Sequence, residues 1–512
     1  MENLKKREDW SKIFSDPKYQ RSLFFIVVVF NLLLAGVLIW SPVTSIKGGE
    51  ASVMYTVQAT MLNKASMYTD PEVIPFSATQ YNPFYYIIVS SVANFLSLTP
   101  GTDVVSIYRV GRFISFVSAL GIAGFLFMTL ANVFCLPRQW SFWLAVTSIL
   151  CAVPWFYALR PDSLMVFFLF GSLYFFLKSF APSHKPFRYL LAAGMLAALS
   201  FFSKQNGLLI ALIIGSYLVF NFKIKNLLWF VCGFALGGAI SVLIFVPFYS
   251  PFFVKSIVQG INNGIDVKQA INEPYFIFAS RFGWLAIITL VLLFIVYTRY
   301  SLQSITKPFH FLAYTLLILF PFSILTALKI GSDINYFHEV ICVMLLLIGT
   351  SIAFIINDLD IQLYARLGAL PFLLVFALAG SLSMSSFLQY GLRSIKRMNE
   401  QKLVYHEEML SYLKSELLKS KAPVFVMSDY TFVNNALPQS CVVPQPDISL
   451  LWYGHNVFEF SELKKAIASG RIQFYAGDGF LLTCFNMDLA KDFKLVRRFD
   501  EYDLYVNKHF QP

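Results

Sequence analysis

Long apolar runs alternate with short polar connections over most of the chain. We predict a membrane-spanning helix wherever roughly 17 to 25 successive residues are mainly apolar. The first run, Ser22 to Trp40, has no small-residue cleavage site after it, so we expect an anchor there and not a removable leader. The pattern predicts about eleven spanning helices, near residues 22–41, 107–130, 139–157, 162–181, 188–203, 206–222, 226–249, 282–298, 309–328, 337–357 and 367–388.

The composition supports the same class. Hydrophobic residues make up 57% of the 512 residues and charged residues only 13%, about half of the roughly 25% charged share of soluble proteins. The mean hydropathy is +0.63. The net charge of +11 does not indicate nucleic-acid binding, because the basic residues fall in short loops between apolar runs and do not cluster on one soluble face. We therefore expect membrane lipids, and no nucleic acid, among the partners.

The basic residues also predict the orientation. They recur in alternate loops, which is the distribution expected for the cytoplasmic side of a membrane protein. With an odd number of helices, the N-terminus is then cytoplasmic and the C-terminus extracytoplasmic, in a multi-pass protein of the cell membrane. The residues are Lys5, Lys6, Arg7, Lys12, Lys18 and Arg21, followed by Arg138, Lys178, Lys185, Arg188, Lys223, Lys225, Arg299, Lys307 and Arg366.

Three parts of the chain follow from these patterns. Residues 1–21 form a cytoplasmic tail, 22–391 a transmembrane domain, and 392–512 a small extracytoplasmic α/β domain. The outward loop 42–106 carries two amphipathic stretches, which we expect to lie as helices along the membrane surface. In the last part a charged helix at 392–420 precedes the strand-like runs "APVFVMSD", "RIQFYAGD" and "YDLYVN" and the helical run "FSELKKAIASG". The predicted fold class is an α-helical polytopic membrane protein with this C-terminal domain.

Cysteine and histidine spacing points to no metal site. The six cysteines include no CxxC pair, and His338 and Glu339 have no second histidine at ligand spacing. Cys441 and Cys484 both lie in the polar C-terminal part, where either a disulfide or two free thiols fits the sequence.

Polar motifs interrupt the apolar runs at five places, all on the predicted outward side. Charged side chains at membrane depth cost free energy and usually serve a function or a structural pairing. Because the motifs converge on one side, we predict that they line a single outward-facing cavity. They are Glu50, "YNPFYY" from Tyr81, "YRVGR" at 108–112, "LRPDS" at 159–163 with "SKQNG" at 203–207, and "KIGSDINYFHE" at 329–339.

Each motif also has a structural explanation that the sequence leaves open. An acid such as Glu50 suits the first turn of a helix, where the helix dipole favours it, and Asn82-Pro83 suits a turn before a helix. The remaining motif residues have similar readings: contact with lipid headgroups for Arg109 and Arg112, a local ion pair for Arg160 with Asp162, and an interfacial anchor for Lys204.

In chain order, these motifs resemble the polytopic C-type glycosyltransferase superfamily. An acid follows the first helix, "YNPFYY" lies in the same loop, arginines begin the second helix and "RPDS" begins the fourth. "FFSKQNGLL" follows the fifth helix, and "GSDINYFHE" precedes a late one. The nearest members are bacterial relatives of protein O-mannosyltransferases and of the lipid A aminoarabinose transferase, similar to glycosyltransferase family 39. The resemblance covers about residues 20–350.

The resemblance implies a reaction and a catalytic residue. Members transfer a sugar from a polyprenyl-phosphate donor, such as an undecaprenyl-phosphate sugar, to an acceptor outside the cytoplasmic membrane. Most carry an acid at the start of the first outward loop, often an Asp-Glu pair, whereas this chain has Gly49-Glu50. Either Glu50 alone is the general base or the activity is lost. The "WWDYG" element of oligosaccharyltransferases is missing, so we expect neither a transferred oligosaccharide nor an asparagine acceptor.

The other motif residues receive roles on the same basis. Guanidinium groups suit phosphate oxygens, so Arg109, Arg112 and Arg160, with Lys204, are the candidates for the donor phosphate. The acceptor is a hydroxyl of a glycan, a lipid or a protein, and in-line displacement inverts the anomeric carbon. We expect no cofactor and leave the need for a divalent metal open. The candidates for binding the substrates are Tyr81, Asn82, Asp162, Gln205, Asn335, Tyr336 and Glu339.

Two other classes of function are compatible with many membrane helices. A lipid or polysaccharide transporter needs a large polar cavity, but charged residues should then continue through the membrane depth, whereas here they favour the outer ends of the helices. A non-catalytic sensor or assembly protein would use the helices only as an anchor, and eleven helices exceed what anchoring requires.

Overall fold

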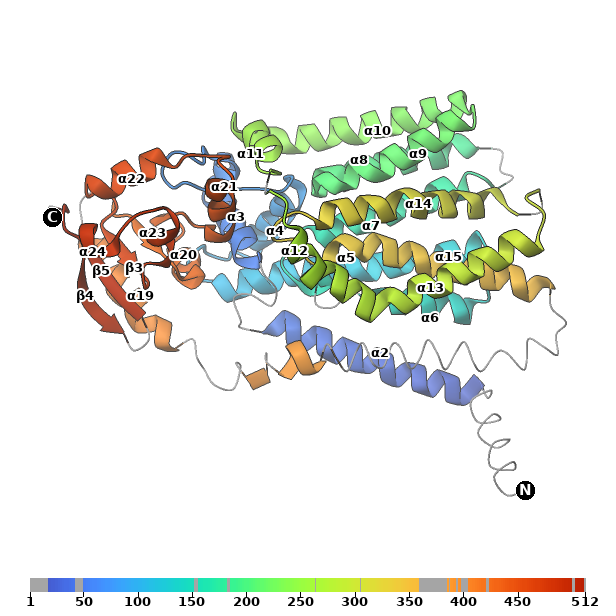
Figure 1. The fold of residues 1–512 in the computed structure, drawn as a ribbon, viewed down its shortest axis with the longest axis horizontal. Coiled ribbons are helices and arrows are strands. Elements are labelled where there is room, and N and C mark those ends of the chain that lie inside the picture. The colour runs from blue at the N-terminus through green and yellow to red at the C-terminus, as the bar shows by residue number, and fades with distance from the viewer. Residues whose placement is uncertain are drawn as a thin grey trace, which may run out of the picture.

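A helical bundle and an α/β domain at one of its ends make up the molecule (Figure 1). The computed structural model describes residues 17–41, 49–151, 155–181, 185–262, 264–303, 305–358, 385, 387–392, 395–396, 404–419, 423–499 and 502–510. Most of the predicted span at 367–388 and most of the predicted cytoplasmic tail lie outside these residues.

The bundle consists of long, mostly antiparallel helices. Six described helices are long and apolar enough to cross a membrane, and Val28–Trp40 and Gln205–Phe220 are shorter apolar helices. The chain is thus a multi-pass membrane protein, and the figure of eleven spans remains a prediction. The helices are α2 (Pro17–Trp40), α5 (Val104–Asn132), α6 (Arg138–Cys151), α7 (Asp162–Lys178), α8 (Pro186–Ser203), α9 (Leu208–Phe220), α10 (Ile224–Phe245), α13 (Phe276–Arg299), α14 (Lys307–Ala327) and α15 (His338–Asp358).

Most predicted spans coincide with these helices to within a few residues, but one is wrong. The run 139–157 was expected to form a single helix, whereas α6 ends at Cys151 and a separate 3-10 helix, η2, covers Trp155–Tyr157. The polar motif "LRPDS" begins two positions after the last residue of η2 and leads into α7, at the end of the bundle that carries the other polar motifs.

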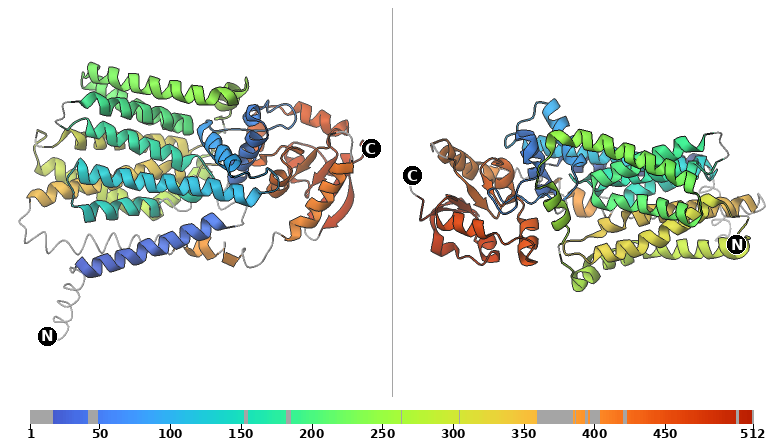
Figure 2. Two further views of the ribbon diagram at one scale, coloured as in Figure 1. Left: turned by 180° about the vertical axis from the view of Figure 1, so that it is seen from behind. Right: turned by 90° about the horizontal axis from the view of Figure 1, so that it is seen from above.

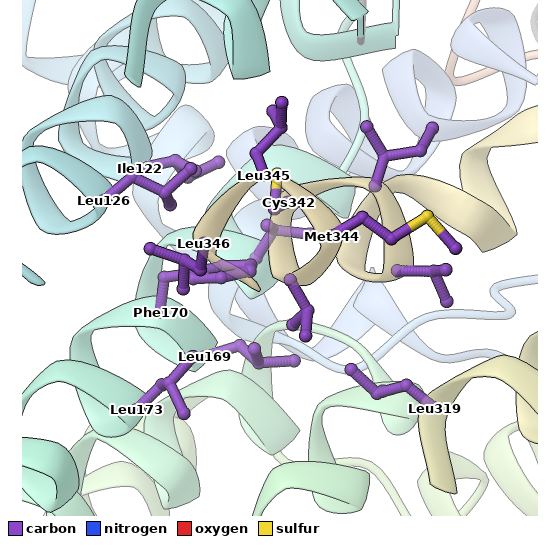
Figure 3. Close-up of a cluster of buried hydrophobic side chains, with 14 of the residues drawn as sticks. Ile122, Leu126, Leu169, Phe170, Leu173, Leu319, Cys342, Met344, Leu345 and Leu346 are labelled. Carbon is purple, nitrogen blue, oxygen red and sulfur yellow. The ribbon is translucent and has the colours of Figure 1, made fainter. Parts of the chain in front are cut away.

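Helix α15 forms the centre of the bundle. In its most apolar stretch 83% of the residues are buried, against 22% to 39% in the other five spanning helices. Side chains of α5, α7 and α14 surround it (Figure 3). The labelled side chains are Cys342, Met344, Leu345 and Leu346 of α15, with Ile122, Leu126, Leu169, Phe170, Leu173 and Leu319 around them.

Close contact between α8 and α10 depends on small residues. A Cβ atom on Gly194 of α8 would lie 2.1 Å from the carbonyl oxygen of Phe230, and one on Gly233 of α10 would lie 2.2 Å from that of Leu191. Membrane helices use small residues in this way, because dispersion forces between closely packed backbones replace the missing hydrophobic drive.

Short elements cover the end of the bundle that faces the α/β domain. The sequence predicts that the first helix of this layer, α3, lies along the membrane surface. An exposed position is wrong for it, because every residue of α3 from Glu50 to Thr60 is buried within the protein. The elements are α3 (Glu50–Leu62), η1 (Lys64–Met67), α4 (Phe84–Phe95), η3 (Gln205–Gly207), η4 (Val246–Phe248), α11 (Phe253–Gln259), α12 (Val267–Ala270), η5 (Ile271–Tyr275) and η6 (Ile334–Phe337).

The C-terminal domain, orange to red in Figure 2, lies at one end of the bundle in both further views. It contains a five-stranded mixed sheet in the order β2-β1-β3-β5-β4. Strand β1 (Val426–Ser428) is parallel to β2 (Cys441–Val442) and β3 (Phe474–Ala476), whereas β5 (Tyr502–Asn507) is antiparallel to β3 and β4 (Phe493–Phe499). The runs quoted from the sequence contain β1, β3 and β5. The helices are α19 (Val404–Lys419), α20 (Thr431–Ala436), α21 (Pro446–Gly454), α22 (Ser461–Ala468), α23 (Phe480–Cys484) and α24 (Leu489–Asp492), and η7 (Phe387–Gly391) precedes the domain.

The segment between η1 and α4 is part of the core of this domain. Phe76 and Ala78 are buried in the same apolar cluster as Trp452. Gln445 accepts a hydrogen bond from the Ser77 hydroxyl at 3.0 Å and donates one to Thr56 of α3 at 2.8 Å. The domain therefore holds α3 in place.

Candidate functional site

The polar motifs gather at the end of the bundle that faces the C-terminal domain. Helix α3 begins at Glu50, α7 begins at Asp162, and η3 and η6 carry Gln205 and Asn335. Those basic residues of the alternate loops that the structure describes lie at the other end, where α7 ends at Lys178 and α14 begins after Thr306. The predicted separation of basic loops from polar motifs is thus present in the fold.

Glu50 is fully buried and paired with an arginine. Its side chain and that of Arg112 on α5 have no exposed surface, and Arg112 forms a fork with Nε 3.1 Å from Oε1 and Nη2 3.2 Å from Oε2. The backbone N–H of Leu159 donates to Oε1 at 2.6 Å. Arg112 also donates to the carbonyl oxygen of Ser41 at 2.8 Å. The carboxylate is therefore fixed to α5 and to the chain before α7.

The residue before Glu50 makes room for a second arginine. Gly49 has φ +80°, the left-handed conformation that glycine adopts without strain. A Cβ atom there would lie 2.3 Å from Nη1 of Arg160. The Arg160 guanidinium thus occupies the space that a side chain at position 49 would take, and it lies next to the Glu50 backbone.

Asp162 connects Arg160 to the chain after α8. Nε of Arg160 lies 3.2 Å from Oδ2 of Asp162, and Nζ of Lys204 lies 2.7 Å from Oδ1. Asn335 of η6 donates to the same Oδ1 at 2.8 Å. All four side chains are buried. Two cations thus share one carboxylate, and with the Glu50–Arg112 pair this end of the bundle buries three cations and two carboxylates.

Two tyrosine rings flank Lys204. Its ammonium lies 5.5 Å from the ring centre of Tyr81 and 5.2 Å from that of Tyr336, a cation–π arrangement. Burial opposes the charge on Lys204, but the attraction of Asp162 and the tyrosines outweighs it, so the pKa of Lys204 is raised. Arg160 donates to the Tyr81 hydroxyl at 2.7 Å. Burial raises the pKa of Tyr81 although the two cations oppose the rise, so its hydroxyl stays protonated at neutral pH.

Four predicted residues lie outside this cluster. Arg109 contacts α2, where its guanidinium lies 5.3 Å from the ring centre of Trp40. Asn82 donates to the carbonyl oxygen of Phe201 in α8, and Gln205 donates to that of Gln80 at 2.6 Å. Glu339 is buried in the first turn of α15, without a hydrogen bond to any residue of the cluster that the structure describes, but close enough for the charges of Lys204 and Asp162 to act on it.

Lys329 was not among the predicted site residues, but it lies close enough to the site for the charge of Lys204 to act on it. This half-buried lysine follows α14 within the quoted motif "KIGSDINYFHE". Burial and repulsion by Lys204 lower its pKa. Mutual repulsion of two lysines indicates a place where an anion is favourable, and the only signal for it in the sequence is membership of the motif.

The comparison with solved structures identifies the fold. The chain is similar to ArnT from Cupriavidus metallidurans bound to undecaprenyl phosphate, with a TM-score of 0.58, 13% identity, and coverage of 95% of this chain and 99% of that one. The fold is thus similar to that of C-type glycosyltransferases. The archaeal oligosaccharyltransferase AglB from Archaeoglobus fulgidus, in complex with an inhibitory peptide and a dolichol-phosphate, has a TM-score of 0.53 and 12% identity, over 95% of this chain and 75% of that one.

A second structure from Archaeoglobus fulgidus gives the same result. The oligosaccharyltransferase tethered to an acceptor peptide with the NVT sequon has a TM-score of 0.54 and 14% identity, and covers 96% of this chain and 74% of that one. No protein-family model and no curated protein matches the sequence. The resemblance to C-type glycosyltransferases inferred from the motifs is thus confirmed by the fold.

Proposed function

We propose that the protein transfers a sugar from a polyprenyl-phosphate-linked donor to an acceptor hydroxyl. The observation that carries the proposal is the buried Arg160–Asp162–Lys204 cluster next to Glu50, at one end of a C-type glycosyltransferase fold. Burying charged groups at membrane depth costs free energy, and such groups usually mark a functional pathway or pair with one another. The distribution of basic loops favours the extracytoplasmic face as the place of reaction.

Arg160 and Lys204 are the proposed ligands of the donor phosphate. In the transfer the bond between the anomeric carbon and the phosphate oxygen breaks, and the polyprenyl phosphate leaves with the bonding electrons. Fixed cations near this oxygen stabilise the developing charge, which is usually the largest catalytic contribution. Lys329 adds a third positive charge to this region. Arg112 is less suited to this role because its guanidinium is occupied by Glu50, and Arg109 lies against Trp40.

Glu50 is the proposed general base. The acceptor oxygen forms its bond to the anomeric carbon from the face opposite the phosphate, and its proton passes to the carboxylate, so the configuration is inverted. In the present state Arg112 and the Leu159 N–H occupy the carboxylate. The proposal therefore requires the acceptor hydroxyl to replace one of the Arg112 contacts.

Buried amide oxygens favour hydroxyl groups as ligands. Among the described residues, the buried side-chain amide oxygens that accept no hydrogen bond are those of Asn82 and Asn335 at this end of the bundle and those of Asn434 and Asn435 in the C-terminal domain. A buried acceptor without a donor costs about 1 to 3 kcal/mol, and a sugar hydroxyl would relieve that cost. Asn335 adjoins Asp162, so we assign it to the donor sugar, and we assign Asn82 with Tyr81 to the acceptor side.

The test is turnover of a panel of undecaprenyl-phosphate sugars by the purified protein, with a membrane extract as the acceptor source. Mass spectrometry would follow loss of donor and release of undecaprenyl phosphate. The control variant is Glu72→Gln, which changes another acid, one that pairs with Lys255. We expect the wild type and this control to consume one donor, and Glu50→Gln to consume none. Turnover by Glu50→Gln at the wild-type rate would exclude Glu50 as the base, and failure of the wild type with every donor would overturn the donor class.

A further inference from the structure

The bundle contains a cavity at the end opposite to the candidate site. Its volume is about 640 Å³, which is within the range of roughly 300 to 1,000 Å³ found for small-ligand pockets. It lies between the ends of α5 and α7, the beginning of α14 and the last turns of α15. The residues that line it and matter here are Phe134, Lys178, Phe180, Lys307, Ala353 and Phe354.

The wall of the cavity is mainly apolar. Phe134, Phe180 and Phe354 contribute rings, and buried Ala353 of α15 also lines the cavity. Aromatic and aliphatic walls of this kind favour a hydrocarbon chain, because contact with apolar side chains removes the chain from water.

The charge of the cavity is entirely positive. Lys178, half-buried at the end of α7, and Lys307, exposed at the beginning of α14, both line it, and no lining residue is acidic. Neither lysine forms an ion pair with any residue that the structure describes. An apolar wall with two ammonium groups is complementary to an amphiphile with an anionic headgroup.

The position of the cavity indicates which amphiphile is available. It lies at the basic end of the bundle, where α6 begins at Arg138 and α13 ends at Arg299, and basic ends of membrane helices face the cytoplasm. The cytoplasmic leaflet carries anionic lipids, and basic pockets between helices on that side bind their headgroups.

We propose that this cavity is a binding site for an anionic phospholipid of the cytoplasmic leaflet. The phosphate lies between Lys178 and Lys307, and an acyl chain lies among Phe134, Phe180 and Phe354. The bound lipid joins α5, α7, α14 and α15 at the end of the bundle away from the sugar-transfer site, so it stabilises the fold by binding only to the folded state.

Native mass spectrometry of the purified full-length protein tests this proposal. The protein would be titrated with phosphatidylglycerol and, separately, with phosphatidylcholine of the same acyl chains. The variant is Lys178→Gln/Lys307→Gln, and the control is Lys223→Gln/Lys225→Gln, which removes the same charge from exposed residues at the same end but outside the cavity. At about 1 kcal/mol for each lysine, we expect phosphatidylglycerol to bind the variant roughly thirtyfold more weakly than the wild type or the control.

A second variant tests the apolar part of the site without changing its charge. Ala353→Phe adds a ring to the wall of the cavity and reduces its volume. It should therefore lower both the retention of phosphatidylglycerol and the rise in melting temperature that this lipid causes. Equal binding of phosphatidylglycerol by the lysine variant and its control, or equal binding of the two lipids by the wild type, would overturn the proposal. So would displacement of phosphatidylglycerol by equimolar undecaprenyl phosphate, since the occupant would then be the carrier lipid. None of these readouts depends on sugar transfer.

Discussion

The guanidinium of Arg160 lies where a side chain at position 49 would have to lie, and Gly49 leaves that space open. The glycine has φ +80°, and its missing side chain leaves room for the Arg160 guanidinium, whose Nη1 would lie 2.3 Å from a Cβ atom. Many C-type glycosyltransferases are expected to carry an acid at this position. In this chain the Arg160 guanidinium fills that space instead, next to Glu50 and in contact with Asp162. The replacement of an acid by Gly49 is thus accompanied by an arginine that uses the space.

Replacement of Gly49 by alanine should therefore disable the site. A non-glycine residue in the left-handed region costs about 1 to 3 kcal/mol in itself, and the new methyl group must displace Arg160. We expect donor turnover to fall at least tenfold, or about 1.4 kcal/mol in the activation barrier. Gly124→Ala is a matched control, because nothing lies within 4 Å of its added Cβ atom. A wild-type rate for Gly49→Ala would show that Arg160 does not need its present position.

The Glu50–Arg112 pair should be strongly coupled in stability. Removing one partner of a buried ion pair leaves an uncompensated charge and typically costs about 3 to 5 kcal/mol, and neither side chain is exposed here. We expect Glu50→Gln and Arg112→Met each to lower the free energy of unfolding by about that amount, and the double variant to lose less than the sum. Unfolding of the purified protein, followed by intrinsic fluorescence, measures the cycle. Strict additivity would contradict the pairing.

Lys329 should affect stability and donor binding in opposite directions. Because burial and Lys204 lower its pKa in the folded protein, the unfolded chain binds more protons between the two pKa values, and stability from this group rises with pH there. Lys329→Gln should thus raise the melting temperature of the ligand-free protein at neutral pH. The Lys329→Gln variant should also bind the donor more weakly. Wild-type donor binding should weaken as the pH rises through the lowered pKa of Lys329, and the variant should lack this part of the pH dependence. Exposed Lys268→Gln is the control, and a lower melting temperature for Lys329→Gln would contradict the expected repulsion.

The C-terminal domain should be required for activity through α3. Gln445 is buried and bonds Ser77 and Thr56, and its replacement by alanine leaves buried partners unsatisfied at about 1 to 3 kcal/mol. We expect Gln445→Ala to lower both the melting temperature and turnover, because α3 carries Glu50. Glu462→Ala, on an exposed part of the same domain, should change neither. Full turnover by a destabilised Gln445→Ala would mean that the domain supports the fold but not the site.

Apolar length and loop charge were sufficient to predict the bundle, because both are local properties. A run of apolar residues between polar ends forms a helix wherever it lies in the chain, so α5, α10, α14 and α15 agree closely with their predicted ranges. Local information was not sufficient for α3, because its residue pattern suits either the membrane surface or burial within the protein. The apolar and small polar residues of α3 suit a membrane surface, but they are buried against the C-terminal domain and the bundle.

The order of motifs in the sequence likewise determined which residues belong together, but only the tertiary structure decided which of them pair. Glu50 accepts from the backbone of Leu159, 109 positions away, and Asp162 accepts from Asn335, 173 positions away. These partners meet because helix packing brings the beginnings of α3, α7 and α15 to one end of the bundle. The same packing leaves Arg109 beside Trp40 and brings Lys329 under the influence of Lys204. A sequence pattern specifies the side of the membrane on which a charge lies, whereas contacts at about 3 Å depend on the distances between helices that the whole core sets.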